Sequence, residues 1–381
     1  MARIPRGLII DESRVGIYHC VQRCVRRAML CGRDAASGKD YEHRKAWIRS
    51  RLEFLAGQFA VDVLGYSVLS NHFHVVLRNR PDIVRGWSDD EVARRWWNLF
   101  PKRKDGDRPA EPEEHELARL KADPDMLAEL RRRLASISWL MRCLAEPIAR
   151  RANREDGCTG RFFEGRYKCQ RLLDESAVLA CSVYVDLNPV RAGVAQTPEE
   201  SQFTSVHDRV EGRKAEQARQ AEETRKTRQA EQPRQRLPKQ APRQARQAPR
   251  QPAEPVCAAK APDAWLSPVE LDPRCDETLE KQPSGRASNR GFLPLGLDAY
   301  LELVDWTGRQ SRADKPGRIP AHLRPILERL GVSAELWVET VTRFGRMFHR
   351  AAGRTESLSQ EAARRGCRWL AGVRNSRKIF A

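Results

Sequence analysis

One long segment of unusual composition limits the folds open to this chain more than any other feature. From residue 208 to about residue 290 the sequence is dominated by Arg, Gln, Ala, Pro and Glu, as in RQRLPKQAPRQARQAPRQPAEP. Such a segment has too little apolar surface to offset the entropy lost on folding. We therefore expect a disordered basic linker over 208–290, between a domain at 1–207 and a smaller domain at 291–381.

The charge balance indicates the class of partner. The chain has 69 Lys and Arg against 51 Asp and Glu, a formal net charge of +18. Such an excess favours a polyanionic partner, and nucleic acid is the first choice. The sequence has no apolar run long enough to span a bilayer and nothing that resembles a basic amphipathic anchor, so we expect no membrane partner. A cytoplasmic, nucleoid-associated protein is the expectation, and charge alone does not separate DNA from RNA.

The pattern of apolar residues predicts an α+β fold for the first domain. Alternating or short apolar runs predict strands at 16–25, 61–70, 72–79 and 160–173, and helical spacing predicts helices at 43–60, about 125–154 and 174–188. This order favours an antiparallel sheet with flanking helices. Residues 80–126 look like an insertion, part helix and part loop. Apolar periodicity returns after residue 291 and predicts a small helical domain.

Two histidines one residue apart stand out in the stretch LSNHFHVVL at 69–77. Side chains alternate between the two faces of a strand, so Phe73, Val75 and Leu77 should face the core. His72 and His74 should then share the opposite, open face, close enough to bind one divalent cation. Two packing residues would give the same pattern, and two histidines alone leave a metal site incomplete.

The helix predicted at 174–188 carries a second candidate pair. Tyr184 and Asn188 are four residues apart and share a helical face, and Asp174 can cap the first turn. Asn188 could supply an oxygen ligand to a metal. Alternatively, Tyr184 packs at the edge of the apolar face and Asn188 ends the helix before Pro189.

Taken together, these motifs resemble a known family. HFH preceded by SN and followed by YVDLNPVRAG is similar to the single-tyrosine HUH transposases, above all to the REP-associated tyrosine transposases and then to other single-strand insertion-sequence transposases. IYHCVQRCVRRAML and GRFFEGRYKCQRLL also resemble that family's first strand and the strand before its tyrosine helix. The resemblance covers about residues 14–207. It implies a ferredoxin-like or RRM-like antiparallel sheet with flanking helices.

The resemblance implies a role for each candidate residue. His72, His74 and Asn188 would hold a divalent metal, Mg²⁺ or Mn²⁺, and Tyr184 would attack a phosphodiester of single-stranded, hairpin-forming DNA to give a 5′-phosphotyrosine. A free phenol has a pKa of about 10, so Tyr184 must be activated. A covalent ester conserves bond energy, so strand joining needs no ATP, consistent with a sequence that lacks a GxxxxGK loop.

Basic residues near the tyrosine helix are candidates for binding the DNA backbone. The candidates are Arg161, Arg166 and Lys168, with the weaker Arg26 and Arg27 after the first strand. Phe162, Phe163 and Tyr167 are interleaved with the first three and could stack on unpaired bases. An ordinary strand with a solvated basic face is the alternative interpretation.

Two other functions remain open at this stage. A relaxase or replication initiator uses the same two-histidine chemistry, although a tyrosine that follows the histidines favours the transposase order. A DNA-binding or regulatory protein derived from a transposase would carry the same residues unused. The insertion, the linker and the C-terminal domain depart from small family members. They leave the DNA target open, and both a monomer and a homodimer remain possible.

Overall fold

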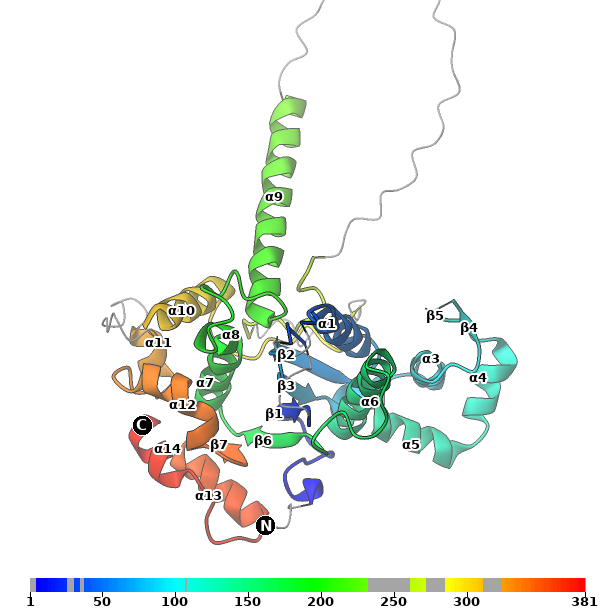
Figure 1. Cartoon of the computed structure of the whole chain (residues 1–381), viewed down its shortest axis with the longest axis horizontal. Helices are drawn as coiled ribbons and strands as arrows, with labels where there is room; N and C mark the ends of the chain where they lie inside the picture. Colours follow the sequence, from blue (N-terminus) through cyan, green and yellow to red (C-terminus); the bar gives the residue numbers. More distant parts are fainter. Residues whose placement is uncertain are drawn as a thin grey trace, which may run out of the picture.

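The computed structural model describes residues 5–25, 31–34, 38–106, 108–231, 261–271, 285–310 and 324–380. This part of the chain has an α+β fold with a central five-stranded sheet, as the sequence predicts (Figure 1). The order of the strands across the sheet is β2-β3-β1-β6-β7. Helices cover both of its faces.

The sheet is antiparallel except at one edge. Its strands are β1 (Gly16–Arg23), β2 (Val61–Val68), β3 (His72–Asn79), β6 (Lys168–Leu172) and β7 (Ala351–Ala352). The predictions for the first three strands are confirmed, and only the β6–β7 pair is parallel. The segment predicted as a strand at 160–173 is extended only over β6, apart from a bridge between Cys24 and Phe163. Gly160 and Gly165 have φ of 99° and 134°, which interrupts the extended backbone.

One face of the sheet packs on α1 (His43–Ala56), α5 (Pro124–Leu134) and α6 (Ile137–Glu155). Phe73, Val75 and Leu77 point into this core, as the alternation predicts. The single helix expected over about 125–154 is two helices. Asp123 caps α5, where its side chain accepts from the backbone N–H of Asp125 and Met126.

The insertion at 80–126 folds beside this core. It contains α2 (Pro81–Gly86), α3 (Asp89–Leu99), β4 (Lys104–Asp105), β5 (Arg108–Pro109) and α4 (Glu114–Lys121). Trp96 of α3 and Phe100 pack against Trp139 of α6, with ring centroids 5.7 Å and 6.4 Å away. The insertion therefore buttresses α6.

The opposite face of the sheet packs on α7 (Glu175–Asp186), which is followed at once by α8 (Asn188–Arg191). The predicted cap is confirmed, since the Asp174 carboxylate accepts from the Ala177 N–H at 3.0 Å. Almost every residue of α7 is buried, although its sequence shows no single apolar stripe. The reason is that α7 lies between the sheet and the C-terminal helices.

The C-terminal region is helical, as predicted. It contains α10 (Leu297–Gln310), α11 (Arg324–Arg329), α12 (Trp337–Met347), α13 (Thr355–Arg364) and α14 (Val373–Ile379). It does not pack as a separate body, however. The backbone of β7 extends the central sheet beside β6, and buried side chains of α10 and α12 share one hydrophobic core with α7. The expected accessory domain at 291–381 is therefore continuous with the sheet.

The expected linker differs from the structure at both ends. Helix α9 (Ser205–Glu231) occupies its first part and projects away from the sheet (Figure 1). Ala, Glu, Gln, Lys and Arg favour a helix, and ion pairs such as Glu222–Lys226 add to its stability. At the other end, Trp265 is buried and packs 5.2 Å from the Tyr66 ring. The expectation for 232–260 and 272–284 lies outside the described residues.

No helix in the described ranges is both long enough and apolar enough to cross a bilayer.

Candidate active site

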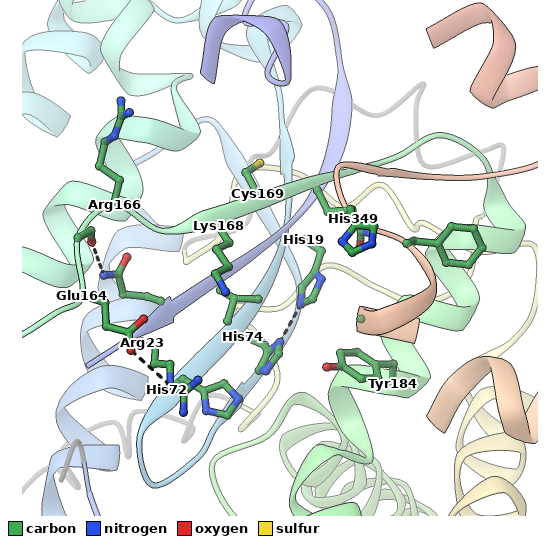
Figure 2. A pocket seen from close by; sticks show the side chains of 16 residues that line it. His19, Arg23, His72, His74, Glu164, Arg166, Lys168, Cys169, Tyr184 and His349 are labelled. Atoms are coloured by element: carbon green, nitrogen blue, oxygen red, sulfur yellow. Dashed lines mark hydrogen bonds and ion pairs between the residues drawn. The ribbon is translucent and has the colours of Figure 1, made fainter. Parts of the chain in front are cut away.

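A cavity of about 270 Å³ lies on the sheet face that α7 covers (Figure 2). Its wall is formed by strands β1, β3 and β6, by residues 164–166 before β6, by α7, and by the end of α12 with the two residues that follow it. Its lining includes four histidines and a tyrosine, which are His19, His72, His74, His349 and Tyr184. His72, His74 and Tyr184, the three residues predicted to carry the chemistry, therefore meet here.

His72 and His74 enter the cavity from β3. The register places His74 opposite Val21 of β1 and Ser67 of β2. The two imidazole centroids are 4.9 Å apart. The prediction that the two histidines lie on an open face is wrong for His74, which is only 3 % exposed. The reason is that α7 and the C-terminal region cover the sheet there.

His19 of β1 is a site residue that the sequence analysis missed. Its Nε2 lies 2.8 Å from Nδ1 of His74, and the two rings stack with centroids 5.1 Å apart. The alternation in GIYHC could have placed His19 on one face of its strand. It could not show that this strand pairs with β3 in the register that makes the two histidines diagonal neighbours.

The hydrogen bonds of the rings leave particular nitrogens for a ligand. His72 Nδ1 lies 2.5 Å from the Asn71 side-chain oxygen, so Nδ1 carries the proton and Nε2 has the lone pair. When His74 Nδ1 carries the proton shared with His19, Nε2 of His74 also has a lone pair. That Nε2 atom is buried and has no hydrogen-bond partner.

Burial keeps both imidazoles neutral. Desolvation lowers the pKa of His72 to about 4, and the nearby positive charges of Arg23 and Lys168 add to this effect. Desolvation also lowers the pKa of His74 well below its usual value, with a further contribution from His19. Neutral imidazoles are the form that binds a metal ion.

Tyr184 of α7 reaches the same cavity. Its ring centroid is 5.7 Å from that of His74 and 6.0 Å from that of His19, and its hydroxyl points toward His74 in Figure 2. Burial raises the pKa of the Tyr184 phenol, and the positive charge of Arg191 opposes this increase. A Cβ added at Gly345 of α12 would lie 3.0 Å from the phenol oxygen. The close approach of α12 therefore depends on a glycine.

Arg191 of α8 is a second residue that the sequence analysis missed. Its guanidinium carbon lies 4.8 Å from the centroid of the Tyr184 ring, and one terminal nitrogen donates to the Thr342 carbonyl. Its Nε and Nη1 atoms are buried and have no hydrogen-bond partner. Its place in the NPVRAG motif was visible, but only the turn from α7 into α8 directs this arginine back to the tyrosine.

Asn188 is less directly part of the site. It is buried, its Nδ2 atom has no hydrogen-bond partner, and it does not line the cavity. Its side chain does interact with the Tyr184 phenol, where it acts to lower the pKa. Its assignment as a metal ligand therefore stays a prediction.

The basic residues proposed for DNA binding divide into three groups. Arg166 and Lys168 are exposed and line the cavity, where they are joined by Arg23. Arg161 is exposed but does not line it. Arg26 and Arg27 lie outside the described residues.

The aromatic residues expected to stack on bases do not have the exposure that this requires. Phe162, Phe163 and Tyr167 are 2 %, 8 % and 8 % exposed and belong to the core beneath α6. The Tyr167 hydroxyl forms a hydrogen bond with the Ser138 hydroxyl at 3.0 Å. That expectation is wrong, because the chain turns inward before β6 and buries these rings.

Comparisons with known proteins give a limited result. No family model and no curated protein matches this chain. A solved structure of a REP-associated tyrosine transposase bound to a REP hairpin is similar over 55 % of this chain and 86 % of that one, with 13 % identity and a TM-score of 0.32. At this TM-score, the assignment of a function depends on the chemistry of the cavity.

Proposed function

We propose that this protein is a metal-dependent nuclease and strand transferase that acts on hairpin-forming, single-stranded DNA, with Tyr184 as its nucleophile. The observation that supports this most directly is the convergence of the Tyr184 phenol with two neutral imidazoles, those of His72 and His74, in one cavity. Cationic side chains at the cavity mouth suit a phosphodiester substrate.

The donor atoms fit a divalent ion. His74 Nε2 is a buried nitrogen that lacks a partner, and the ring of His72 is adjacent. Asn188 lies outside the cavity lining but interacts with the Tyr184 phenol, and a 180° rotation of its amide would exchange the partnerless nitrogen for an oxygen; we keep it as the proposed third ligand. Among the described residues no three His, Cys, Asp or Glu side chains are grouped to hold a metal. Two imidazoles and a neutral oxygen leave room for water and phosphate, as Mn²⁺ or Mg²⁺ requires.

A bound Mn²⁺ or Mg²⁺ ion would neutralise charge on the scissile phosphate and polarise it for attack. The Tyr184 oxygen forms a bond to phosphorus as the bond from phosphorus to the 3′-oxygen breaks. The phenol loses its proton, and the leaving 3′-oxygen takes one up. The product is a 5′-phosphotyrosine, and attack by a 3′-hydroxyl on this ester rejoins a strand.

Arg191 assists the deprotonation of Tyr184. Its positive charge lies beside the phenol and favours the phenolate, which opposes the cost of burial. Lys168 and Arg166 then bind phosphates next to the reacting one. The positively charged side chains of the mechanism thus come from α8 and from the segment around β6.

The test is to trap the covalent intermediate. Purified protein is incubated with Mn²⁺ and an end-labelled hairpin oligonucleotide that carries unpaired flanks, and adducts that resist SDS are separated by electrophoresis. Wild-type protein should form an adduct, Tyr184→Phe should form none, and His72→Ala should form much less. Removal of the metal with EDTA should also abolish it.

Tyr41→Phe is the matched control, because Tyr41 is partly exposed and does not line the cavity. It should form the adduct at the wild-type rate. Hairpins that bind wild-type protein without ever becoming attached would favour a DNA-binding or regulatory protein. Preferred cleavage of duplex DNA would contradict the proposal.

A further inference from the structure

A second groove, of about 520 Å³, adjoins the cavity. The two share three lining residues, Gln22, Gly165 and Arg166. The Gln22 side chain donates to the Gly165 carbonyl at 2.9 Å, which ties the shared boundary to β1. In Figure 2 the Arg166 side chain extends away from the histidines. The groove therefore lies next to the cavity, across the boundary that these three residues form.

The wall of the groove is an aromatic surface held firmly in position. Trp139 of α6 lines the groove and is partly exposed. The guanidinium carbons of Arg133 and Arg142 lie 4.5 Å and 5.1 Å from its ring centroid. On another side, Trp96 of the insertion contacts it edge to face, with centroids 5.7 Å apart. A ring packed in this way loses little entropy when a flat ligand stacks on it.

The charge of the groove is positive. Arg6, Arg142 and Arg166 line it, and Glu146 is its acidic side chain. Glu146 pairs with Arg142 and with Arg150, so its charge is already compensated. The Arg6 guanidinium lies over the buried Tyr167 ring, with its carbon 3.9 Å from the ring centroid. It places a positive charge at the base of the groove. Alternating cationic and aromatic groups suit a single-stranded nucleic acid.

We propose that this groove binds the unpaired nucleotides on one side of the scissile phosphate, with a base stacked on Trp139 and phosphates held by Arg142 and Arg166. The inference rests on the proposed nuclease function, because the groove adjoins the cavity that holds Tyr184. The proposal also assigns a role to the insertion, because Trp96 packs against Trp139 and supports the stacking surface. Bases thus stack on Trp139, and not on the buried rings of the segment before β6.

The experiment measures binding and not cleavage. Fluorescence anisotropy with labelled DNA hairpins compares the full-length protein on a blunt hairpin with the same hairpin carrying a flank on its 5′ or its 3′ side. Wild-type protein should bind one flanked hairpin more tightly than the blunt one. Loss of one base stack should weaken binding of that flanked hairpin about tenfold or more in Trp139→Ala. Binding of the blunt hairpin should not change.

Matched variants separate stacking from folding. Trp139→Phe keeps an aromatic face and should retain most of the affinity for the flank. Trp369→Ala removes a tryptophan that is 72 % exposed and lines neither the groove nor the cavity, so it should bind as wild type does. Arg142→Gln, at an exposed position, should weaken flank binding and reduce the slope of log affinity against log salt by about one.

A direct contact gives a second measurement. Iododeoxyuridine placed in the flank should cross-link on irradiation to Trp139, and mass spectrometry of the digested complex identifies the peptide. Equal affinities of wild type and Trp139→Ala for flanked hairpins would overturn the proposal. Tighter binding of an RNA flank than of a DNA flank would also overturn it.

These outcomes are distinct from failure of the nuclease proposal. Flank binding that depends on Trp139, without a Tyr184 adduct, would keep the groove and reject the nuclease. A Tyr184 adduct, together with flank binding that does not depend on Trp139, would keep the nuclease and reject the groove.

Discussion

The two faces of the central sheet differ in what they bury, although the same strands form both. Toward α1 and α6, β3 presents Phe73, Val75 and Leu77 to an apolar core. Toward α7, β1 and β3 present His19 and His74, which are 5 % and 3 % exposed. Both faces bury apolar clusters, but only the second also buries the histidines that line the cavity.

Buried polar atoms without partners gather on the second face. Ser67 Oγ, His74 Nε2 and Gln170 Nε2 belong to one such set, since Ser67 pairs with His74 and Gln170 pairs with His19 across the sheet. Each such atom costs about 1–3 kcal/mol of folding free energy when it stays unpaired. These partnerless atoms lie around the proposed metal site, whereas the first face contributes mainly apolar packing.

The largest expected effect is on stability and falls on the first face. Phe73→Ala should lower the free energy of unfolding by about 3–5 kcal/mol, because Phe73 is fully buried. The neighbouring His72→Ala should cost less than about 1 kcal/mol, since His72 is partly exposed. Urea unfolding followed by circular dichroism measures both. Similar losses for the two variants would remove the contrast between the faces.

The next largest effect on stability should come from replacing Asp186, a polar residue of α7 on the second face whose role is structural. The buried Asp186 carboxylate accepts from the Ser205 hydroxyl, the Tyr300 hydroxyl and the Val206 N–H, and so joins α7 to α9 and α10. Asp186→Ala leaves these donors unpaired and should cost about 3 kcal/mol in urea unfolding. Tyr300→Phe removes one bond and should cost about 1 kcal/mol. If Asp186→Ala unfolds as wild type does, the C-terminal helices are not anchored through this carboxylate.

His19 should affect metal binding more than stability. Its ring orients His74, so His19→Phe should weaken Mn²⁺ binding about tenfold or more. Isothermal titration calorimetry of the full chain measures this without any DNA. His115→Phe is the matched control, because the His115 side chain is 75 % exposed and does not line the cavity. Unchanged Mn²⁺ affinity in His19→Phe would mean that His19 only packs against His74.

The smallest expected effect comes from Gly345→Ala, which should change helix stability and access to the proposed nucleophile in opposite directions. Gly345→Ala should raise the stability of α12 by up to about 1 kcal/mol, since alanine favours a helix. The added methyl group would crowd the Tyr184 hydroxyl at 3.0 Å and should slow formation of the adduct. Thermal unfolding measures the change in stability, and the rate of adduct formation measures access to the Tyr184 hydroxyl. Faster or unchanged adduct formation would show that the phenol reacts from another position.

Local pattern was sufficient for several features. Strict alternation in HFHVVL assigned Phe73 and His74 to opposite faces, and Asp174 marked the start of the tyrosine helix. These features depend on residues within one or two turns or on one strand, which is the range that a sequence pattern describes. The residues that favour a helix over α9 were also present in the sequence, but the low apolar content of this segment led to the prediction of a disordered linker from residue 208.

Features that depend on distant parts of the chain were not accessible in this way. The pairing of His19 with His74 requires a specific register between two strands, and β7 joins the sheet from a region that looked separate. The same holds for Gly345, whose importance arises only where α12 crosses Tyr184.

Residue periodicity was enough to show which side chains share a face, because a strand has a period of two and a helix a period of 3.6. Which faces meet, and how deeply they are buried, depends on the packing of distant segments. It placed His74 in a covered cavity and Tyr184 beside Arg191. Desolvation and nearby charge, which set the protonation of these groups, arise from that packing and have no local signature.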